Sequence, residues 1–234
     1  NYSLIPSQRS AILLLNRSIL SSVAKVSGGE GIRIKPVGMH TKAEWTIQMS
    51  AIYSSLTRSN LTTAYLSNGT GGEFYTRISS TAGIQVKNGR DGDDTWTQIP
   101  LQAGKWLHIT YVHKDKKTTV YVNGKVQKVF ENSAITFGEN SMIVVGNSGY
   151  RNDYLREIRL WDKALTESEI NDYLYLPMDP ATPHLISYLP LSKEMETKDL
   201  KAPAGTENVT TKARIEYVEN VKFPADELVI VNQE

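Results

Sequence analysis

The 234-residue chain contains no cysteine, and its longest aliphatic run, Ala11 to Leu15, is only five residues long. Without thiols, the chain forms no disulfide and uses no cysteine as nucleophile or metal ligand. A membrane-spanning helix needs about 20 apolar residues, so we expect no membrane insertion by this segment. The formal net charge is only +1. This near-neutral balance gives no electrostatic basis for a nucleic-acid partner.

The composition otherwise describes a chain that can bury a core. Hydrophobic residues make up 40% and charged residues 22%, which separates it from disordered sequences. All-β domains commonly reach this length as one unit, so we expect one main domain with extensions. The chain begins at Asn1 with no signal peptide in view. We expect that any such peptide has been removed or lies outside this segment.

The stretch from Lys105 to Gln127 carries the clearest fold signal. Trp106 to His113 and Thr118 to Asn123 are rich in β-branched and aromatic residues, with a charged gap between them. These features predict a β-hairpin. Asn123-Gly124 then favours a second reversal into Val126 to Phe130, which predicts a three-stranded antiparallel meander.

Many further short runs alternate in polarity and are separated by Gly and Asn turns. Regular turns every ~8 to 12 residues are typical of a sandwich or barrel. The runs that we expect as strands are Ile32 to Lys35, Glu44 to Tyr53, Thr63 to Leu66, Glu73 to Ile78, Ile84 to Val86, Ser141 to Val145, Tyr154 to Leu160 and Leu185 to Leu191.

One helix and two uncertain ends complete the prediction. Thr166-Glu-Ser-Glu169 forms a capping box, which predicts a helix that begins there and ends before Pro177. Residues 1–27 fit a helix or a strand, and residues 192–211 suggest a loop. Lys212 to Val221 and Glu227 to Asn232 suggest either a small hairpin or extra strands on a sheet edge.

The pattern GKW-x-HITYV, VYVNGK, VVGN and EIRLWDKALTESEI resembles the laminin-G-like branch of the concanavalin A-like lectin and glucanase superfamily. The resemblance implies an all-β, antiparallel, two-sheet jelly-roll sandwich with one short helix. On this basis we divide the chain into an N-terminal extension (1–30), a sandwich (31–191) and a C-terminal extension with extra strands (192–234). The resemblance also implies that Trp45, Trp106 and Trp161 are core residues and that His108 is structural.

No constellation of catalytic residues is evident. A retaining glycosidase of this superfamily would need two Glu spaced four apart on one strand face, and no segment shows this. Gly146-Asn-Ser-Gly149 precedes a predicted strand rather than the helix that a nucleophile elbow requires. We therefore expect no enzyme, with a glycoside hydrolase or polysaccharide lyase kept as the alternative.

Glycan binding has a different requirement, because sugar rings stack on exposed aromatic rings while amide, carboxylate and guanidinium groups bind hydroxyls. The predicted loop Tyr150, Arg151, Asn152, Asp153 and Tyr154 has this composition. Trp96, which follows an acidic loop, is a further candidate. For Tyr154 and Trp96 the competing interpretation is packing against the sandwich.

Asp91, Asp93 and Asp94 place three carboxylates within four residues, a composition that suits calcium. The loop lacks the Glu at the twelfth position of an EF-hand, and aspartates at a hairpin tip also simply form turns. Calcium binding is therefore an alternative to a turn here. His108 and His113 have opposite parity on one predicted strand, so they do not converge on one metal.

Taken together, the sequence favours a non-catalytic carbohydrate-binding or adhesion module of an exported bacterial cell-surface protein. Its expected partner is a glycan or polysaccharide, with other domains of a larger chain beside it. A structural spacer or a protein-interaction domain is the second alternative, because such sandwiches serve many functions.

Overall fold

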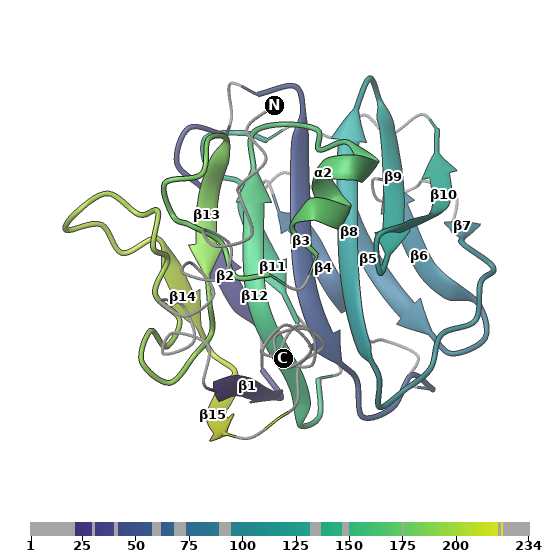
Figure 1. Ribbon diagram of the computed structural model, residues 1–234, viewed down its shortest axis with the longest axis horizontal. Helices are drawn as coiled ribbons and strands as arrows, with labels where there is room; N and C mark the ends of the chain where they lie inside the picture. The colour runs from purple at the N-terminus through teal and green to yellow at the C-terminus, as the bar shows by residue number, and fades with distance from the viewer. Residues whose placement is uncertain are drawn as a thin grey trace, which may run out of the picture.

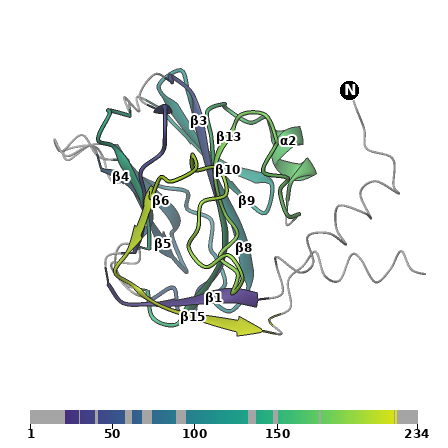
Figure 2. The same cartoon turned by 90° about the vertical axis from the view of Figure 1, so that its left-hand side faces the viewer.

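The computed structural model describes residues 22–29, 31–39, 42–57, 62–67, 74–88, 95–131, 137–146, 150–174, 176–219 and 221. Within these residues the chain forms two antiparallel sheets packed face to face, with one helix on the outside of the first sheet (Figures 1 and 2). The predicted all-β sandwich with one short helix is therefore confirmed.

Sheet A contains eight of the described strands, in the order β10-β9-β8-β3-β12-β1-β15, with β13 beside the second half of β12. Its strands are β1 (Ser22–Ser27), β3 (Trp45–Ile52), β8 (Trp106–Lys114), β9 (Lys117–Val122), β10 (Lys125–Phe130), β12 (Asp153–Trp161), β13 (Leu185–Leu189) and β15 (Arg214–Glu219).

Sheet B contains seven of the described strands, in the order β14-β2-β11-β4-β5-β6-β7. Its strands are β2 (Ile32–Ile34), β4 (Thr62–Ser67), β5 (Phe74–Ser79), β6 (Gly83–Asn88), β7 (Thr95–Trp96), β11 (Met142–Val145) and β14 (Val209–Thr211).

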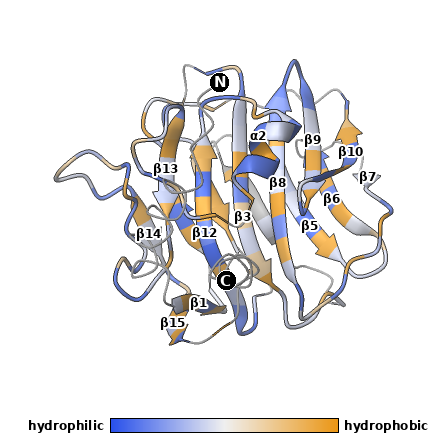
Figure 3. Ribbon diagram, in the orientation of Figure 1, coloured by the Kyte–Doolittle hydropathy of each residue, from blue (hydrophilic) through white to orange (hydrophobic). Residues whose placement is uncertain are grey.

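The core lies between the sheets because alternate side chains of each strand point inward. Along β3 these are Trp45, Ile47 and Met49, all buried. Figure 3 shows the resulting alternation of hydrophobic and polar bands along β3, β8 and β12. A hydrogen bond of 2.7 Å between the Tyr111 hydroxyl of sheet A and Thr63 Oγ1 of sheet B joins the layers. Burial raises the pKa of Tyr111 to about 12, so this hydroxyl stays protonated.

Helix α2 (Glu167–Asp172) begins at the predicted capping box. Glu169 N donates to Thr166 Oγ1 at 3.2 Å, and Thr166 N donates to Glu169 Oε2 at 2.9 Å. Ile170 is the buried residue that anchors the helix. The predicted helix start is therefore confirmed, and its position over sheet A shapes the site described below.

The ends of the described chain join both sheets. β1 and β15 pair with each other along sheet A, so the second half of the ambiguous region 1–27 contains a strand. β14 pairs with β2, which corrects the expected loop at 192–211, since its last three residues are a strand. Glu227 to Asn232 lie outside the described residues. The division into a domain and two extensions stays a prediction.

Candidate functional site

The face of sheet A that points away from sheet B is the candidate surface. On β3, β8 and β12 the residues that alternate with the core are mostly polar, and most of them are nonetheless buried. The cross-strand register places these residues in rows. We call the part of the face around Gln48, Arg159 and Trp161, which α2 covers, the sealed half. We call the partly exposed row that contains Tyr154 and Trp106 the open row.

The sealed half lies beneath α2 and the segment that follows it. Ile170 and Met178 pack against Val112 and Trp161 in a hydrophobic cluster separate from the main core. Tyr173 stacks on Trp161 with ring centroids 5.5 Å apart. A small second core therefore covers this part of the polar face.

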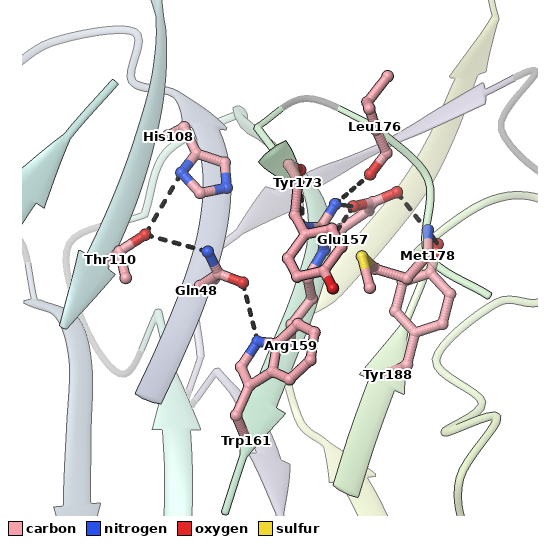
Figure 4. Close-up of polar contacts among 10 residues, drawn as sticks. All are labelled: Gln48, His108, Thr110, Glu157, Arg159, Trp161, Tyr173, Leu176, Met178 and Tyr188. Carbon is pink, nitrogen blue, oxygen red and sulfur yellow. Dashed lines mark hydrogen bonds and ion pairs between the residues drawn. The ribbon is translucent and has the colours of Figure 1, made fainter. Parts of the chain in front are cut away.

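A buried chain of hydrogen bonds runs across the sealed half (Figure 4). Trp161 Nε1 donates to Gln48 Oε1 at 2.8 Å, and Gln48 Nε2 donates to Thr110 Oγ1 at 3.3 Å. Thr110 Oγ1 lies 3.4 Å from His108 Nδ1. Burial, together with the charge of Arg159, lowers the pKa of His108 to about 3, so this imidazole is neutral at physiological pH.

Arg159 and Glu157 form the charged centre of the sealed half. Arg159 Nε donates to Glu157 Oε2 at 3.0 Å, and Arg159 Nη1 donates to the Tyr173 carbonyl at 3.0 Å. Arg159 Nη2 also binds Glu157 Oε2 and the Leu176 carbonyl. The guanidinium thus fastens the chain after α2 to the sheet.

Glu157 reaches this position through a β-bulge between Arg156 and Ile158. Its φ of 58° is uncommon for a residue other than glycine, and surrounding contacts must hold it there. The Tyr188 hydroxyl donates to Glu157 Oε1 at 3.1 Å. Burial, and then the charge of Glu157, raises the pKa of Tyr188. Both carboxylate oxygens therefore have partners inside the protein, an arrangement that holds a loop in place.

The open row crosses the same face beyond the sealed half. It has one residue from each of five neighbouring strands, and none of them is fully buried. Its members, in order across the sheet, are Glu216, Lys25, Tyr154, Ile52 and Trp106.

Two aromatic residues in the open row flank an aliphatic one, and an ion pair stands at its end. Tyr154 and Trp106 each lie directly opposite Ile52. Lys25 Nζ lies 3.6 Å from Glu216 Oε2. The expectation that Trp106 is a core residue is wrong, because it lies half-buried on the outer face. Trp45 and Trp161 are buried.

The predicted ligand loop divides between the surface and the interior. Arg151 and Asn152 are exposed beside Tyr154. Asp153 is 0% exposed. Its Oδ1 accepts hydrogen bonds from the backbone and side chain of Ser54, and its Oδ2 accepts one from Arg151 N. Asp153 thus shapes the loop without facing a ligand.

Tyr150 lies in the core, with 2% of its surface exposed. Its hydroxyl is 3.4 Å from that of Tyr53, and its ring packs against Gly146, where a Cβ would come within 2.6 Å of it. The expected role of Tyr150 as an exposed stacking ring therefore does not fit its position. Burial beside Tyr150 also raises the pKa of Tyr53.

Trp96 is half-buried and lies on β7, the edge strand of sheet B, whereas the open row lies on sheet A. Its carbonyl accepts a hydrogen bond of 3.0 Å from Lys128 Nζ on β10. The structure therefore does not bring Trp96 together with residues 150–154.

Asp91, Asp93 and Asp94 lie outside the described residues, so calcium binding there stays a prediction. Among the residues that are described, no group of three or more His, Asp or Glu side chains could hold a metal ion. Within the same residues, none of the helices is long and apolar enough to cross a membrane.

One signal in the sequence could have identified Trp106 as a residue of the outer face. It shares parity with the polar residues His108 and Thr110, whereas Leu107 and Ile109 share the core face. A tryptophan on the polar side of a half-buried strand is the candidate for an exposed ring.

The two antiparallel sheets packed face to face define a β-sandwich of the concanavalin A-like lectin type. A laminin-G family model, described as the concanavalin A-like lectin/glucanases superfamily, matches residues 27–171. Because the match covers more than half of the chain, the protein belongs to this superfamily. Among curated proteins, none matches the chain.

Solved structures share the fold at low identity. A candidate carbohydrate-binding protein from Bacteroides ovatus is 18% identical with a TM-score of 0.63, covering 86% of this chain and 60% of its own. A pentraxin from Limulus polyphemus is 14% identical with a TM-score of 0.50, covering 71% and 85%. A Trypanosoma rangeli sialidase is 14% identical with a TM-score of 0.51, covering 66% and 28%. The chain thus spans about 60% of the length of the Bacteroides protein.

Proposed function

We propose that the protein is a non-catalytic carbohydrate-binding module and that the open row, with Arg151 and Asn152, is its glycan site. The observation that carries this proposal is the placement of Tyr154 and Trp106, two half-exposed aromatic side chains, in one row on the outer face of sheet A. Membership of a lectin-containing superfamily supports the proposal.

The spacing of the two aromatic side chains suits an oligosaccharide. Tyr154 and Trp106 stand two strands apart, on β12 and β8, and neighbouring strands are about 4.8 Å apart. The two side chains are therefore about 10 Å apart across the sheet, so that more than one sugar ring can contact the row. Ile52 between them adds apolar surface that fits the C–H faces of a sugar.

The loop that precedes β12 exposes two polar residues next to the open row. Arg151 and Asn152 both stand next to Tyr154 in the loop that Asp153 shapes. Guanidinium and amide groups donate hydrogen bonds to sugar hydroxyls. Aromatic side chains and polar donors are thus neighbours at Tyr154, a combination that glycan recognition requires.

The test is a glycan array followed by affinity measurement with the best glycan. Trp106→Ala and Tyr154→Ala are each expected to weaken binding about 10-fold or more, because stacking on the ring is lost. The matched controls are Trp106→Phe and Tyr154→Phe, which keep a ring and are expected to keep most of the affinity. Thermal melting verifies that each variant is folded.

Two outcomes would contradict the proposal. If the array shows no binding, the spacer or protein-interaction alternative takes its place. If the protein releases reducing sugar from a polysaccharide, the hydrolase or lyase alternative does.

Export to a bacterial cell surface is part of this proposal, since glycan capture takes place there. Calcium is a further part of it, and a calcium titration with thermal melting tests that part. A ligand that binds the folded state raises the melting temperature, so an unchanged value at millimolar calcium would remove calcium from the proposal.

A further inference from the structure

A second row of chemically suited residues crosses the outer face of sheet B. Arg77 on β5 lies directly opposite Gln85 on β6, and Gln85 lies directly opposite Trp96 on β7. The neighbours of Gln85 along β6, Ile84 and Val86, point into the core, so the row points outward. A cation, an amide and an indole therefore stand side by side on three adjacent strands.

Gln85 is the unusual member of this row. Only 2% of its surface is exposed, and its Oε1 is buried without a hydrogen-bond partner among the described residues. Buried polar groups in folded proteins nearly always have a partner, so an unsatisfied one calls for an explanation. Because this oxygen is itself covered by protein atoms, the hydroxyl of a bound ligand would supply the missing donor once the side chains above Gln85 move aside.

The two neighbours of Gln85 are held in place. The Arg77 guanidinium carbon lies 5.1 Å from the centre of the Tyr75 ring, a cation–π contact that favours this position of the guanidinium. Within the described part of the chain, Arg77 forms no ion pair. The bond from Lys128 Nζ to the Trp96 carbonyl anchors β7. Both Arg77 and Trp96 are only half-buried.

We infer that Arg77, Gln85 and Trp96 form a second ligand site that binds a carboxylated saccharide. A guanidinium presents parallel N–H groups that match a carboxylate, the amide binds a ring hydroxyl, and the indole face stacks on the sugar ring. The inference rests on the proposed function, but the site is separate from the open row because it lies on the opposite sheet. The protein would then bind glycans on both faces.

The experiment compares carboxylated saccharides with their carboxyl-reduced counterparts. The probes are polygalacturonate, alginate, hyaluronan and sialyllactose, each titrated into the wild-type protein in intact and reduced form. We expect at least one intact probe to bind, and its reduced form to bind about 10-fold more weakly or less well still.

Variants assign the binding to this row. Arg77→Gln and Trp96→Ala are each expected to lower the affinity for the carboxylated probe about 10-fold or more. Arg77→Lys, which keeps the charge and loses the paired N–H groups, should lie between Arg77→Gln and wild type. Trp96→Phe serves as the second aromatic variant if Trp96→Ala does not fold. Lys198→Ala, at an exposed position outside both rows, should leave this binding unchanged.

The outcomes separate this inference from the proposed function. Binding that depends on Trp106 and Tyr154 but not on Arg77 and Trp96 would overturn the second site and leave the proposed function intact. Equal binding of intact and reduced probes would overturn the carboxylate assignment. If no saccharide binds by either face, both fail.

Discussion

The two parts of the outer face of sheet A lie on the same strands, but one part is covered by other segments of the chain and the other is partly exposed. In the sealed half, α2 and its following segment cover a polar network around Arg159 and Gln48 (Figure 4). In the open row, Tyr154 and Trp106 remain partly exposed beside a polar loop. Polar side chains that are covered stabilise one conformation, whereas the uncovered ones remain available to a ligand.

This contrast teaches that polarity alone does not locate a binding site on a sandwich. Glu157, His108 and Gln48 have the chemistry of an active site, yet their hydrogen bonds end on other parts of the protein. The position of α2 accounts for this difference in exposure, because α2 covers the sealed half and leaves the open row uncovered.

The largest loss of stability is expected for Arg159→Ala in the sealed half. It leaves the Glu157 carboxylate buried without its cation and releases the Tyr173 and Leu176 carbonyls. Breaking a buried pair from one side costs about 3–5 kcal/mol. Denaturant unfolding should show a loss of this size.

The double variant Glu157→Leu/Arg159→Met is the matched control for Arg159→Ala. It removes both charges, and replacing a buried ion pair by apolar residues of similar size is often neutral. Recovery of much of the lost stability is expected. If the double variant is as unstable as Arg159→Ala, the uncompensated charge is not the cause.

His108 is expected to make a smaller, pH-dependent contribution to the free energy of unfolding. Its pKa falls from 6.5 to about 3 on folding, so between these values the unfolded chain binds a proton that the folded protein does not. Stability is therefore unaffected by this residue above pH 6.5 and decreases as the pH falls through that window. The loss is about 1.4 kcal/mol per pH unit once the pH is well below 6.5.

His108→Gln should remove this share of the pH dependence. Chemical denaturation at pH 7.5 and at pH 5.5 would show about 1.4 kcal/mol less destabilisation on acidification for the variant than for the wild type. Parallel pH profiles for the two proteins would mean that His108 is not buried as a neutral imidazole.

Thr166→Ala tests the helix that creates the contrast. Loss of the cap leaves Glu169 N without its side-chain acceptor, at a cost of about 1 kcal/mol. For a chain of this size the melting temperature should fall by about 2–4 °C. Thr166→Ser keeps the acceptor and should restore most of the difference. An unchanged melting temperature in Thr166→Ala would show that packing of Ile170 alone holds α2.

Local signals in the sequence were sufficient for the central strands and for this helix, whereas the choice of a two-sheet sandwich over a barrel came from the family resemblance. The alternation in Trp106 to His113, the Asn123-Gly124 turn and the capping box at Thr166 each depend on neighbouring residues alone, and each has its expected counterpart in the structure. Pairing between distant segments left no such local signal. The contact between β1 and β15 joins Lys25 to Glu216 and could not be read from either strand by itself.

The candidate site was only partly predictable for the same reason. The composition of residues 150–154 indicated a loop, but the burial of Tyr150 depends on the space beside Gly146. The exposure of Trp106 depends on where α2 ends over the sheet. Which side of a strand is covered is a tertiary property, whereas the alternation that separates the two sides is local.

Arg151→Ala should have the smallest effect on stability, although it is the same chemical change as Arg159→Ala and lies at the start of the same polar face. Arg151 is exposed, and the hydrogen bond that it gives to Asp153 comes from its backbone, which the variant keeps. The free energy of unfolding should therefore change by less than about 0.5 kcal/mol. The affinity for the glycan of the open row should nonetheless fall about 10-fold, because a charged donor is lost. A loss of stability close to that of Arg159→Ala, or an unchanged affinity, would show that the open row and the sealed half do not differ in the way that their exposure indicates.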